Sequence, residues 1–488
     1  MGVETLRLID LLDGDLNKLS NGAVIKDMEI TGLTCDSRKV NPGFLFAAIP
    51  GSYSDGRDYI DDAFKRGASA VLAPIGTLGN GDIEVVNSEN TRKSYAQMAA
   101  RFFNQQPPRI AAITGTNGKT SVVSFVRQIW KSLGGQAASL GTLGIDAPGY
   151  QTSEGLTTPD PVDLHECLAL LRKRGIESLA LEASSHGLDQ YRLDGVNVSI
   201  AGFTNLGRDH MDYHGSMEKY LNAKKRLFSE VLAKDGVSVL NADSEAYLIL
   251  LESARGRVVS YGRKGTDIRL DNIQVFEGGQ HLSLNVMGNS YKISLPLSGF
   301  FQVENAMCAL GIVLAGGADT AKAVKTLENL QGVPGRIQHV GNSPDGAAIY
   351  VDFAHTPDAL ATILRTLRPY AEKSLNLVFG CGGERDAGKR PEMGRIASKL
   401  ADKIIITDDN PRSEDAANIR AQSLATCPTA LEIGDRAQAI RRAIDQLQKG
   451  DVLVIAGKGH ETGQLIKGVE YPFNDAEEIR AVLEEIAL

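Results

Sequence analysis

A glycine-rich segment with a lysine, TGTNGKT at residues 114–120, carries the strongest chemical signal in the chain. It follows the apolar run RIAAI and precedes a stretch whose apolar residues recur on one helical face, so we predict a loop between a strand and a helix. In such a loop backbone N–H groups face phosphates, Lys119 reaches the terminal phosphates and Thr120 ligates Mg²⁺. Ile113 replaces the first glycine of the longer GxxxxGK[ST] pattern, and a glycine turn that caps a helix is the alternative.

We consider four further side chains for a catalytic or metal-binding role beside this loop. Glu182 ends the apolar run SLALE, where a carboxylate can hold Mg²⁺ or its water, although a buried structural glutamate is the alternative. His210 in NLGRDHMDYHG lies in a polar loop after a predicted strand, and both a Mg²⁺ or substrate role and a structural role stay open. His214 is not favoured as a zinc ligand, because the glutamate of HExxH and a third ligand are missing. Lys224, judged on chemistry alone, is a solvated helical lysine.

Arginines gather beside glycines in the last third of the chain. GGERDAGKR contains Arg385 and Arg390, and DDNPR contains Arg412. Both segments follow apolar runs, and open α/β sheets bind ligands at the carboxyl ends of their strands. Because guanidinium groups pair with carboxylates through two hydrogen bonds, we predict a carboxylate site there. For any single arginine, a surface charge is the alternative.

Strands and helices alternate along most of the chain, which predicts the α/β class with mainly parallel, doubly wound sheets. Breaks at NQQPP and QGVPGR divide the chain into three predicted domains, at residues 1–106, 107–334 and 335–488. Between about residues 256 and 299, alternating runs such as HLSLNV and YKISL, joined by MGNS, predict a small antiparallel side sheet inserted in the middle domain.

Composition excludes several classes of protein. The net charge of −8 over 488 residues, without a long basic run, argues against nucleic-acid binding. No 18 apolar residues run together, so no membrane span is predicted. The five cysteines are scattered without a CxxC, and the N-terminus lacks the pattern of a signal peptide. We therefore expect a cytoplasmic protein, and we expect it to be a monomer.

Seven ordered segments together resemble the Mur ligases of peptidoglycan synthesis: TGTNGKT, LEASSHGL, NLGRDHMDYHG, VDFAHTPDAL, GCGGERDAGKRPEMG, DDNPR and AGKGHE. The resemblance runs nearly end to end. It implies a first domain for the UDP end of a nucleotide precursor, a central P-loop ATPase and a Rossmann-like C-terminal domain for the incoming amino acid. It also implies a part in cell-wall biogenesis, and through it in cell shape and cell division.

Within the family, the resemblance is to members that add the third residue of the stem peptide. It implies ATP-dependent, ADP-forming addition of meso-diaminopimelate to UDP-N-acetylmuramoyl-L-alanyl-D-glutamate through an acyl phosphate. The segment Asp409–Arg412 looks like the DNPR form associated with meso-diaminopimelate, and lysine-adding relatives usually differ there. Meso-diaminopimelate has a far carboxylate that Arg412 and Arg385 can pair with, whereas lysine has only an ammonium.

The resemblance implies roles for individual residues. Lys224 would be carbamylated by CO₂, which turns a cation into an anionic ligand, and Lys119, Lys224 and His210 would be catalytic. The implied Mg²⁺ ligands are Thr120, Glu182, His210 and the carbamate on Lys224. The implied ATP-binding residues are Gly115, Thr116, Asn117, Gly118, Lys119, Thr120, Asn305, Arg336 and Asp352. The implied precursor-binding residues are Asp36, Ser37, Arg38, Thr157, Thr158, Ser184 and Arg192. The implied meso-diaminopimelate-binding residues are Arg385, Asp409, Asn410, Pro411, Arg412, Gly457 and Glu461.

Two other functions compete with this interpretation. A folylpolyglutamate synthetase resembles Mur ligases in its P-loop and last domain, but the extra first domain and DDNPR disfavour it. A P-loop switch or motor would use ATP to change partners without forming an amide bond. Its nucleotide turnover would not require both small substrates.

Overall fold

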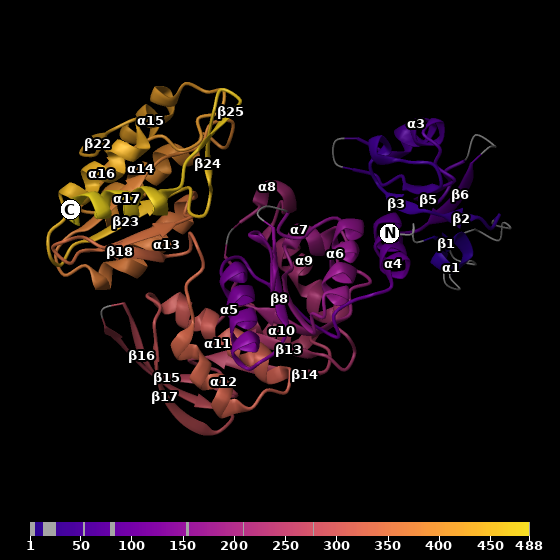
Figure 1. Ribbon diagram of the computed structural model, residues 1–488, viewed down its shortest axis with the longest axis horizontal. Helices are drawn as coiled ribbons and strands as arrows, with labels where there is room; N and C mark the ends of the chain where they lie inside the picture. Colours follow the sequence, from indigo (N-terminus) through magenta and orange to yellow (C-terminus); the bar gives the residue numbers. More distant parts are fainter. Residues whose placement is uncertain are drawn as a thin grey trace. The chain divides into compact units, whose positions relative to one another are not determined.

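The computed structural model describes residues 5–12, 26–51, 54–78, 83–152, 156–207, 209–276 and 278–487. The chain divides into two compact units. Figure 1 labels the helices and strands along the chain. The first unit comprises Met1–Asp271, Leu284–Tyr291 and Glu304–Thr326. The second comprises Asn272–Ser283, Lys292–Val303 and Leu327–Leu488.

The first unit begins with a small four-stranded parallel sheet. Its strands, in order, are β3 (Gly32–Thr34), β4 (Phe44–Ala47), β5 (Ala70–Pro74) and β6 (Glu84–Ser88). Alternate residues of each strand face opposite sides, so Leu45 and Leu72 pack toward α4 (Thr91–Phe103), whereas Phe46 and Val71 pack toward α3 (Ile60–Lys65). The remaining elements here are β1 (Leu6–Arg7), α1 (Leu8–Leu12) and β2 (Glu29–Ile30).

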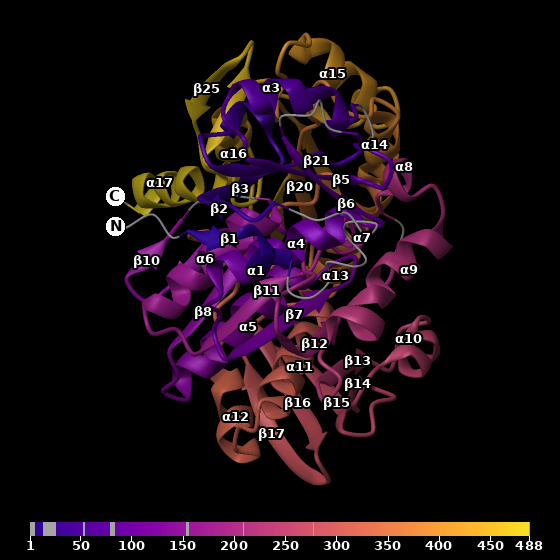
Figure 2. The ribbon, with the colours of Figure 1, turned by 90° about the vertical axis from the view of Figure 1, so that its right-hand side faces the viewer.

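A larger sheet carries the glycine-rich loop. Its strand order is β10-β9-β8-β11-β7-β12-β13-β14-β15-β16-β17, and neighbours from β8 to β15 pair in parallel. The first strands are β7 (Arg109–Thr114), β8 (Ala137–Gly141), β9 (Gly144–Ala147), β10 (Tyr150–Gln151), β11 (Ser178–Glu182), β12 (Val198–Phe203), β13 (Val237–Asn241) and β14 (Arg257–Gly262). Helix α5 (Lys119–Ser132) packs along β8 and β11 (Figure 2). The other helices are α6 (Pro161–Lys173), α7 (Ser185–Asp189), α8 (Met211–His214), α9 (Met217–Arg226), α10 (Tyr247–Ser253), α11 (Phe300–Ala315) and α12 (Thr320–Thr326).

The strands predicted as a side sheet belong instead to this large sheet. They are β15 (Ile268–Phe276), β16 (Gly279–Val286) and β17 (Asn289–Leu295). Met287 and Gly288 both have positive φ, so they form the tight two-residue turn of an antiparallel hairpin between β16 and β17. Strand β15 continues the sheet beyond β14, because Ile268 and Arg269 of β15 pair with Tyr261 and Gly262 of β14. The prediction of antiparallel strands therefore holds for the hairpin, but the prediction of a separate sheet is wrong.

The second unit is a six-stranded sheet between two layers of helices. Its order is β18 (Gln338–Asn342), β19 (Ala348–Asp352), β23 (Val452–Ala456), β20 (Leu375–Phe379), β21 (Lys403–Ile406) and β22 (Leu431–Glu432), with only β18 antiparallel. One face packs on α13 (Pro357–Leu367), α14 (Lys389–Leu400) and α15 (Ala416–Leu424), and the other on α16 (Arg436–Asp445) and α17 (Asp475–Ala487). The hairpin β24 (Gly463–Ile466) and β25 (Val469–Pro472) follows β23. The predicted doubly wound α/β class is confirmed.

Among the helices of the described residues, none is both long enough and apolar enough to cross a membrane.

Candidate active site

The glycine-rich loop connects the end of β7 to the start of α5, as predicted. Gly115 and Gly118 have φ of 148° and 86°, which L side chains rarely adopt. A Cβ at Gly115 would collide with Thr204 Oγ1, and one at Gly118 would collide with Asn305 Oδ1. The loop therefore needs glycine at both positions, and the structure places Asn305 of α11 directly against it.

Two lysine ammonium groups converge on one carbonyl of this loop. Lys119 Nζ donates to Gly115 O at 2.9 Å and to Thr116 O at 2.8 Å, and Lys224 Nζ from α9 donates to Gly115 O at 2.8 Å. Lys224 is only 1% exposed. Burial, and then the nearby Lys119 charge, lower the pKa of Lys224 well below its usual value. The interpretation of Lys224 as a solvated lysine is wrong, because the inward face of α9 carries it into the core beside the loop.

Thr204 and the first residues of the NLGRDH segment, which directly follow the neighbouring strand β12, form hydrogen bonds with the glycine-rich loop. Thr204 Oγ1 donates to Asn117 O at 2.6 Å, and Asn117 N donates to Asn205 Oδ1 at 3.0 Å. Thr116 Oγ1 accepts from Gly207 N at 2.9 Å and lies 3.2 Å from the Tyr220 hydroxyl. The two motifs therefore form one structure, because β7 and β12 are adjacent and end at the same edge of the sheet.

Glu182 ends β11, the other neighbour of β7, and is 1% exposed. Its carboxylate accepts from Thr142 N at 2.9 Å and from the Thr142 hydroxyl at 3.3 Å. Thr142 Oγ1 also lies 3.0 Å from Thr157 Oγ1. Thr142 was not identified in the sequence, where its only signal is a place directly after β8.

His210 is held in a left-handed conformation with φ of 54° at the start of α8, and its side chain is 45% exposed. Its ring makes edge contacts with His186 at 4.7 Å and with Tyr220 at 6.3 Å between centroids. Tyr220 in turn lies under Lys224 Nζ, 4.2 Å from the ring centroid. The Tyr220 ring therefore lies between His210 and the glycine-rich loop. His214 is buried, and its Nε2 lies 3.0 Å from Ser185 Oγ.

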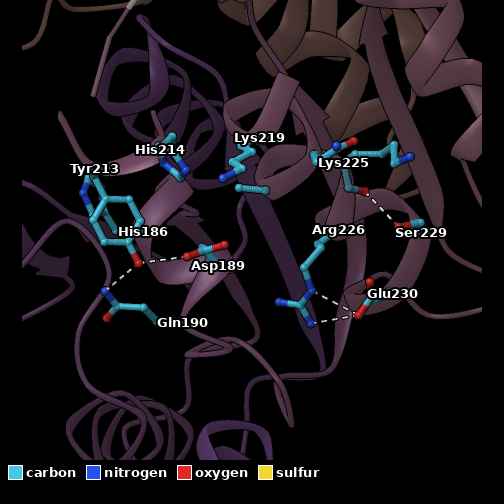
Figure 3. Close-up of a pocket in the computed structure, with 12 residues that line it drawn as sticks. His186, Asp189, Gln190, Tyr213, His214, Lys219, Lys225, Arg226, Ser229 and Glu230 are labelled. Carbon is cyan, nitrogen blue, oxygen red and sulfur yellow. Dashed lines mark hydrogen bonds and ion pairs between the residues drawn. The ribbon is translucent and has the colours of Figure 1, made fainter. Parts of the chain in front are cut away.

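A polar cavity of about 1050 Å³ opens beside these histidines (Figure 3). Tyr213 donates to Asp189 at 2.8 Å and accepts from Gln190 at 3.1 Å, and His186 lies against Tyr213. On the opposite wall Arg226 pairs with Glu230 at 3.0 Å. The lining residues that the structure describes include none of the predicted site residues.

The predicted precursor-binding residues form two groups within the first unit. In one, Thr158 Oγ1 donates to Glu182 O at 2.8 Å and accepts from Ser184 N at 3.0 Å, and Arg192 donates to Thr158 O at 2.6 Å. These side chains continue the network around Glu182.

The other group follows β3, where Asp36 caps a short 3₁₀ helix that contains Ser37 and Arg38. Arg38 Nη2 pairs with Asp36 Oδ2 at 2.8 Å, and this hydrogen-bonded partner lowers the pKa of Asp36 to about 2. The Arg38 side chain is 82% exposed. The neighbouring Cys35 Sγ lies 3.5 Å from Asp160 Oδ2, close in sequence to Thr158.

Arg336 and Asp352 lie together in the second unit. The Asp352 carboxylate accepts from Ile337 N and Ala354 N, both at 2.8 Å, and burial raises its pKa although Arg336 opposes the shift. The Arg336 guanidinium lies 4.7 Å from the centre of the Phe353 ring. Both predicted ATP-binding residues therefore have well-defined positions at the carboxyl end of β19.

Three loops meet at the carboxyl ends of β23, β20 and β21, where the sequence predicted a carboxylate site. Asn410 Nδ2 donates to Glu461 Oε2 at 2.9 Å, and Gly457 lies against the Asp409 carboxylate. Lys458, which is 0% exposed, donates to Asn410 Oδ1 at 3.0 Å and to Glu461 Oε2 at 2.8 Å. Lys458 was not selected from the sequence, although it stands inside AGKGHE.

The three arginines of these loops differ. Arg412 has a φ of 53°, donates from Nη1 to Gly383 O at 2.6 Å, and pairs through its backbone with β24. Arg385 is exposed on its loop. Arg390 is 1% exposed and donates to Glu414 at 2.9 Å and to Gly382 O at 3.1 Å. Arg390 is therefore an internal support of the loop, and neither the surface nor the ligand-facing interpretation describes it.

The sequence matches known protein families. Three family models match consecutive parts of the chain: "Mur ligase family, catalytic domain" at residues 29–104, "Mur ligase middle domain" at 113–313 and "Mur ligase, glutamate ligase domain" at 335–459. The chain belongs to the Mur ligase family.

Relatives within the family narrow the comparison. A Caulobacter vibrioides protein named UDP-N-acetylmuramoyl-L-alanyl-D-glutamate--2,6-diaminopimelate ligase is 51% identical over 480 residues, which cover 96% of this chain and 99% of that protein. A solved structure of a ligase with the same name has a TM-score of 0.71 at 35% identity and covers 94% of this chain and 96% of its own. The folylpolyglutamate synthase of Mycobacterium tuberculosis, complexed with ADP and AMPPCP, has a TM-score of 0.61 at 20% identity, over 75% of this chain and 92% of its own. That last likeness shows the fold alone.

These comparisons confirm the predicted family, its three-domain α/β architecture and the class of ATP-dependent, ADP-forming ligases. They disfavour the P-loop switch and the folylpolyglutamate synthetase.

Proposed function

We propose that this chain adds meso-diaminopimelate to UDP-N-acetylmuramoyl-L-alanyl-D-glutamate and converts ATP to ADP and phosphate. The γ-phosphoryl group passes to the D-glutamate γ-carboxylate, because a free carboxylate is a poor electrophile. The amino group then attacks the acyl phosphate, and the tetrahedral intermediate expels phosphate. Relatives that carry the name of this reaction over nearly the whole chain support the choice of substrates.

The observation that carries the proposal is the convergence of Lys119 and Lys224 on Gly115 O. Lys119, at the start of α5, and the backbone N–H groups of the loop stabilise charge on the transferring oxygens in this proposal. The proposed role of Gly115–Thr120, Asn305, Arg336 and Asp352 is to bind the ATP that donates the phosphoryl group.

The residues around the loop fit a Mg²⁺ site if Lys224 becomes an anion. A lysine whose pKa is lowered by burial offers a neutral amine, which can form an N–C bond to CO₂ and release a proton. We propose that the resulting carbamate, Thr120, Glu182 and His210 hold Mg²⁺. When bound, the ion offsets negative charge on the phosphoryl group.

The remaining predicted residues bind the two other substrates, the UDP-precursor and meso-diaminopimelate. Asp36, Ser37 and Arg38 face the UDP end of the precursor, and Thr157, Thr158, Ser184 and Arg192 hold its muramoyl-dipeptide. Arg385, Asp409–Arg412, Gly457 and Glu461 hold meso-diaminopimelate, with Arg412 on its far carboxylate and Glu461 on its far ammonium. We propose domain boundaries at residues 106 and 334, so the proposed precursor-binding residues come from the first and second domains and the proposed ATP-binding residues from the second and third.

We also propose that the protein acts as a cytoplasmic monomer without a nucleic-acid partner. All five cysteines are free thiols, as in a reducing compartment, and the net charge of −8 opposes binding to phosphate backbones. Light scattering of the purified protein would measure its mass directly.

The test of the reaction is an incubation with ATP, Mg²⁺ and the UDP-precursor, with meso-diaminopimelate or L-lysine added in parallel. Phosphate release and a one-residue mass gain with meso-diaminopimelate are expected. Incorporation of L-lysine alone would disprove the substrate but keep the ligase. Hydrolysis of ATP without any conjugate would disprove the ligase.

A separate test concerns the carbamate. Protein equilibrated with ¹³C-bicarbonate should show one carbamate resonance that is absent from Lys224→Arg. Its presence in both proteins would assign it to another amine.

A further inference from the structure

A buried salt bridge lies inside the proposed amino-acid site. Lys458 follows β23 by two residues, has no exposed surface, and pairs with Glu461 at 2.8 Å. A lysine is rarely buried completely unless an anion and further acceptors satisfy it. Here Glu461 Oε2 and Asn410 Oδ1 supply that anion and acceptor.

Lys458 fixes the orientation of the Asn410 amide. Asn410 Oδ1 accepts from Lys458 Nζ at 3.0 Å and from Leu465 N at 2.9 Å, so the carbonyl oxygen faces two donors. The amide nitrogen must then face Glu461 Oε2, to which it donates at 2.9 Å. A flipped amide would set its NH₂ group against the Lys458 ammonium and the Leu465 N–H.

The same contacts orient Glu461. Its Oε2 accepts two hydrogen bonds, whereas its Oε1 accepts none from the part of the chain that the structure describes. The Glu461 side chain is 34% exposed, so one oxygen is anchored inward and the carboxylate still reaches the open side. Lys458 therefore influences the charge that a ligand meets without touching the ligand.

The charges of the three loops can be counted at this site. The segments GGERDAGKR, DDNPR and AGKGHE together carry no net charge. Their acidic residues are Glu384, Asp386, Asp408, Asp409 and Glu461, and their basic residues are Arg385, Lys389, Arg390, Arg412 and Lys458. The far end of meso-diaminopimelate carries one carboxylate and one ammonium, whereas the far end of lysine carries only an ammonium. Without the Lys458 ammonium the three segments would carry a net charge of −1, which favours a cationic far end over a zwitterionic one.

We propose that Lys458 is a positioning residue that sets amino-acid specificity: its buried ammonium balances Glu461 and tunes the site for a far end that is a zwitterion. This inference rests on the proposed function. Lys458 lies outside the set of implied contacts, and the inference assigns to it part of the selectivity otherwise ascribed to Arg412 and Arg385.

The test compares the full-length wild type with Lys458→Met, which keeps the length of the side chain and removes its charge. Initial rates are measured for meso-diaminopimelate and L-lysine at saturating ATP, Mg²⁺ and UDP-precursor. The ratio of kcat/KM for meso-diaminopimelate over L-lysine should fall by roughly 10-fold or more, through the KM of the amino acids, with the KM of ATP unchanged. Equal losses for both amino acids would show that Lys458 only supports the loops and would overturn the proposal.

A double variant, Lys458→Met with Glu461→Gln, keeps the test decisive if the single variant does not fold. It removes one charge of each sign and leaves no buried ion without a partner. Both amino acids have a far ammonium, so the loss of Glu461 should weaken them alike and leave the wild-type ratio within about 3-fold. A ratio that falls by 10-fold in this variant would contradict the charge argument. If the wild type does not couple meso-diaminopimelate at all, the proposed function fails instead.

Discussion

Lys224 and Lys458 are both buried lysines beside loops of the proposed binding sites, but their surroundings differ in charge. Lys224 has a backbone carbonyl, the face of Tyr220 and the Lys119 ammonium around it, and the opposing effect of the Asp209 charge on its pKa is smaller than that of Lys119. Lys458 has the Glu461 carboxylate and the Asn410 carbonyl oxygen. Burial beside another cation favours a neutral, reactive amine, whereas burial beside a carboxylate retains an ion pair. The same residue type is therefore proposed to form a carbamate in one region, and it is half of an ion pair in the other.

The largest expected effect is at Lys224. Lys224→Arg keeps a positive charge but cannot form a carbamate, so kcat for phosphate release should fall by about 1000-fold. Lys234→Arg, which changes an exposed lysine of the same unit, is the matched control and should keep the wild-type rate. If Lys224→Arg kept a rate near the wild-type value, a carbamate on Lys224 would not be needed for the reaction.

A fully buried ion pair shows what charge balance contributes to stability. Arg436 and Asp475 are each 0% exposed, with Arg436 Nε 2.7 Å from Asp475 Oδ1. Arg436→Met leaves a buried carboxylate unpaired and should lower the free energy of unfolding by about 3–5 kcal/mol. Urea unfolding of Arg436→Met and of Arg436→Met with Asp475→Leu would measure the effect. The double variant should recover most of the loss, and failure to recover would assign the loss to packing.

His165 is a third buried basic side chain, and unlike Lys224 and Lys458 it has no hydrogen-bond partner among the described residues. Neither ring nitrogen has a hydrogen bond within the described residues, and burial lowers the pKa of His165 to about 4. The unfolded chain binds a proton near pH 6.5 and the folded chain only near pH 4, so stability should fall as pH drops between these values. The total loss is about 3 kcal/mol, and stability above pH 7 is unaffected by this group.

The measurement is the free energy of unfolding as a function of pH in the wild type and in His165→Leu. The slope between pH 6.5 and pH 4 should be smaller in the variant by about one proton. Identical slopes in the two proteins would show that His165 takes up its proton in the folded state as well.

The smallest effect is expected at the exposed pair of Arg38 and Asp36. Because Arg38 is 82% exposed, Arg38→Ala should not measurably shift the midpoint of thermal unfolding. If Arg38 contacts the UDP end of the precursor, the KM of that substrate alone should rise by roughly 3-fold. A change in the KM of ATP instead would place Arg38 outside the proposed precursor site.

Local patterns predicted the positions of the loops better than the partners within them. TGTNGKT, the strand end at Glu182 and the DNPR segment were found because apolar runs and glycines mark strand ends along the sequence. Thr142, Lys458 and the support role of Arg390 were missed, because each depends on a partner that lies 20 or more residues away or across a loop. Lys224 was misjudged on its chemistry for the same reason, since its carbonyl partner is 109 residues distant.

The hydrogen bonds of Asn410 have a consequence for how amino-acid preference changes during evolution. One amide joins Lys458, Glu461 and the backbone of β24, so substitutions at these positions share an interaction and will not have additive effects. A single substitution leaves an orphaned donor or charge that only a second substitution relieves. If these residues set the amino-acid preference as proposed, evolutionary routes to a new amino acid pass through impaired intermediates, and the order of mutations restricts which preferences a lineage can reach.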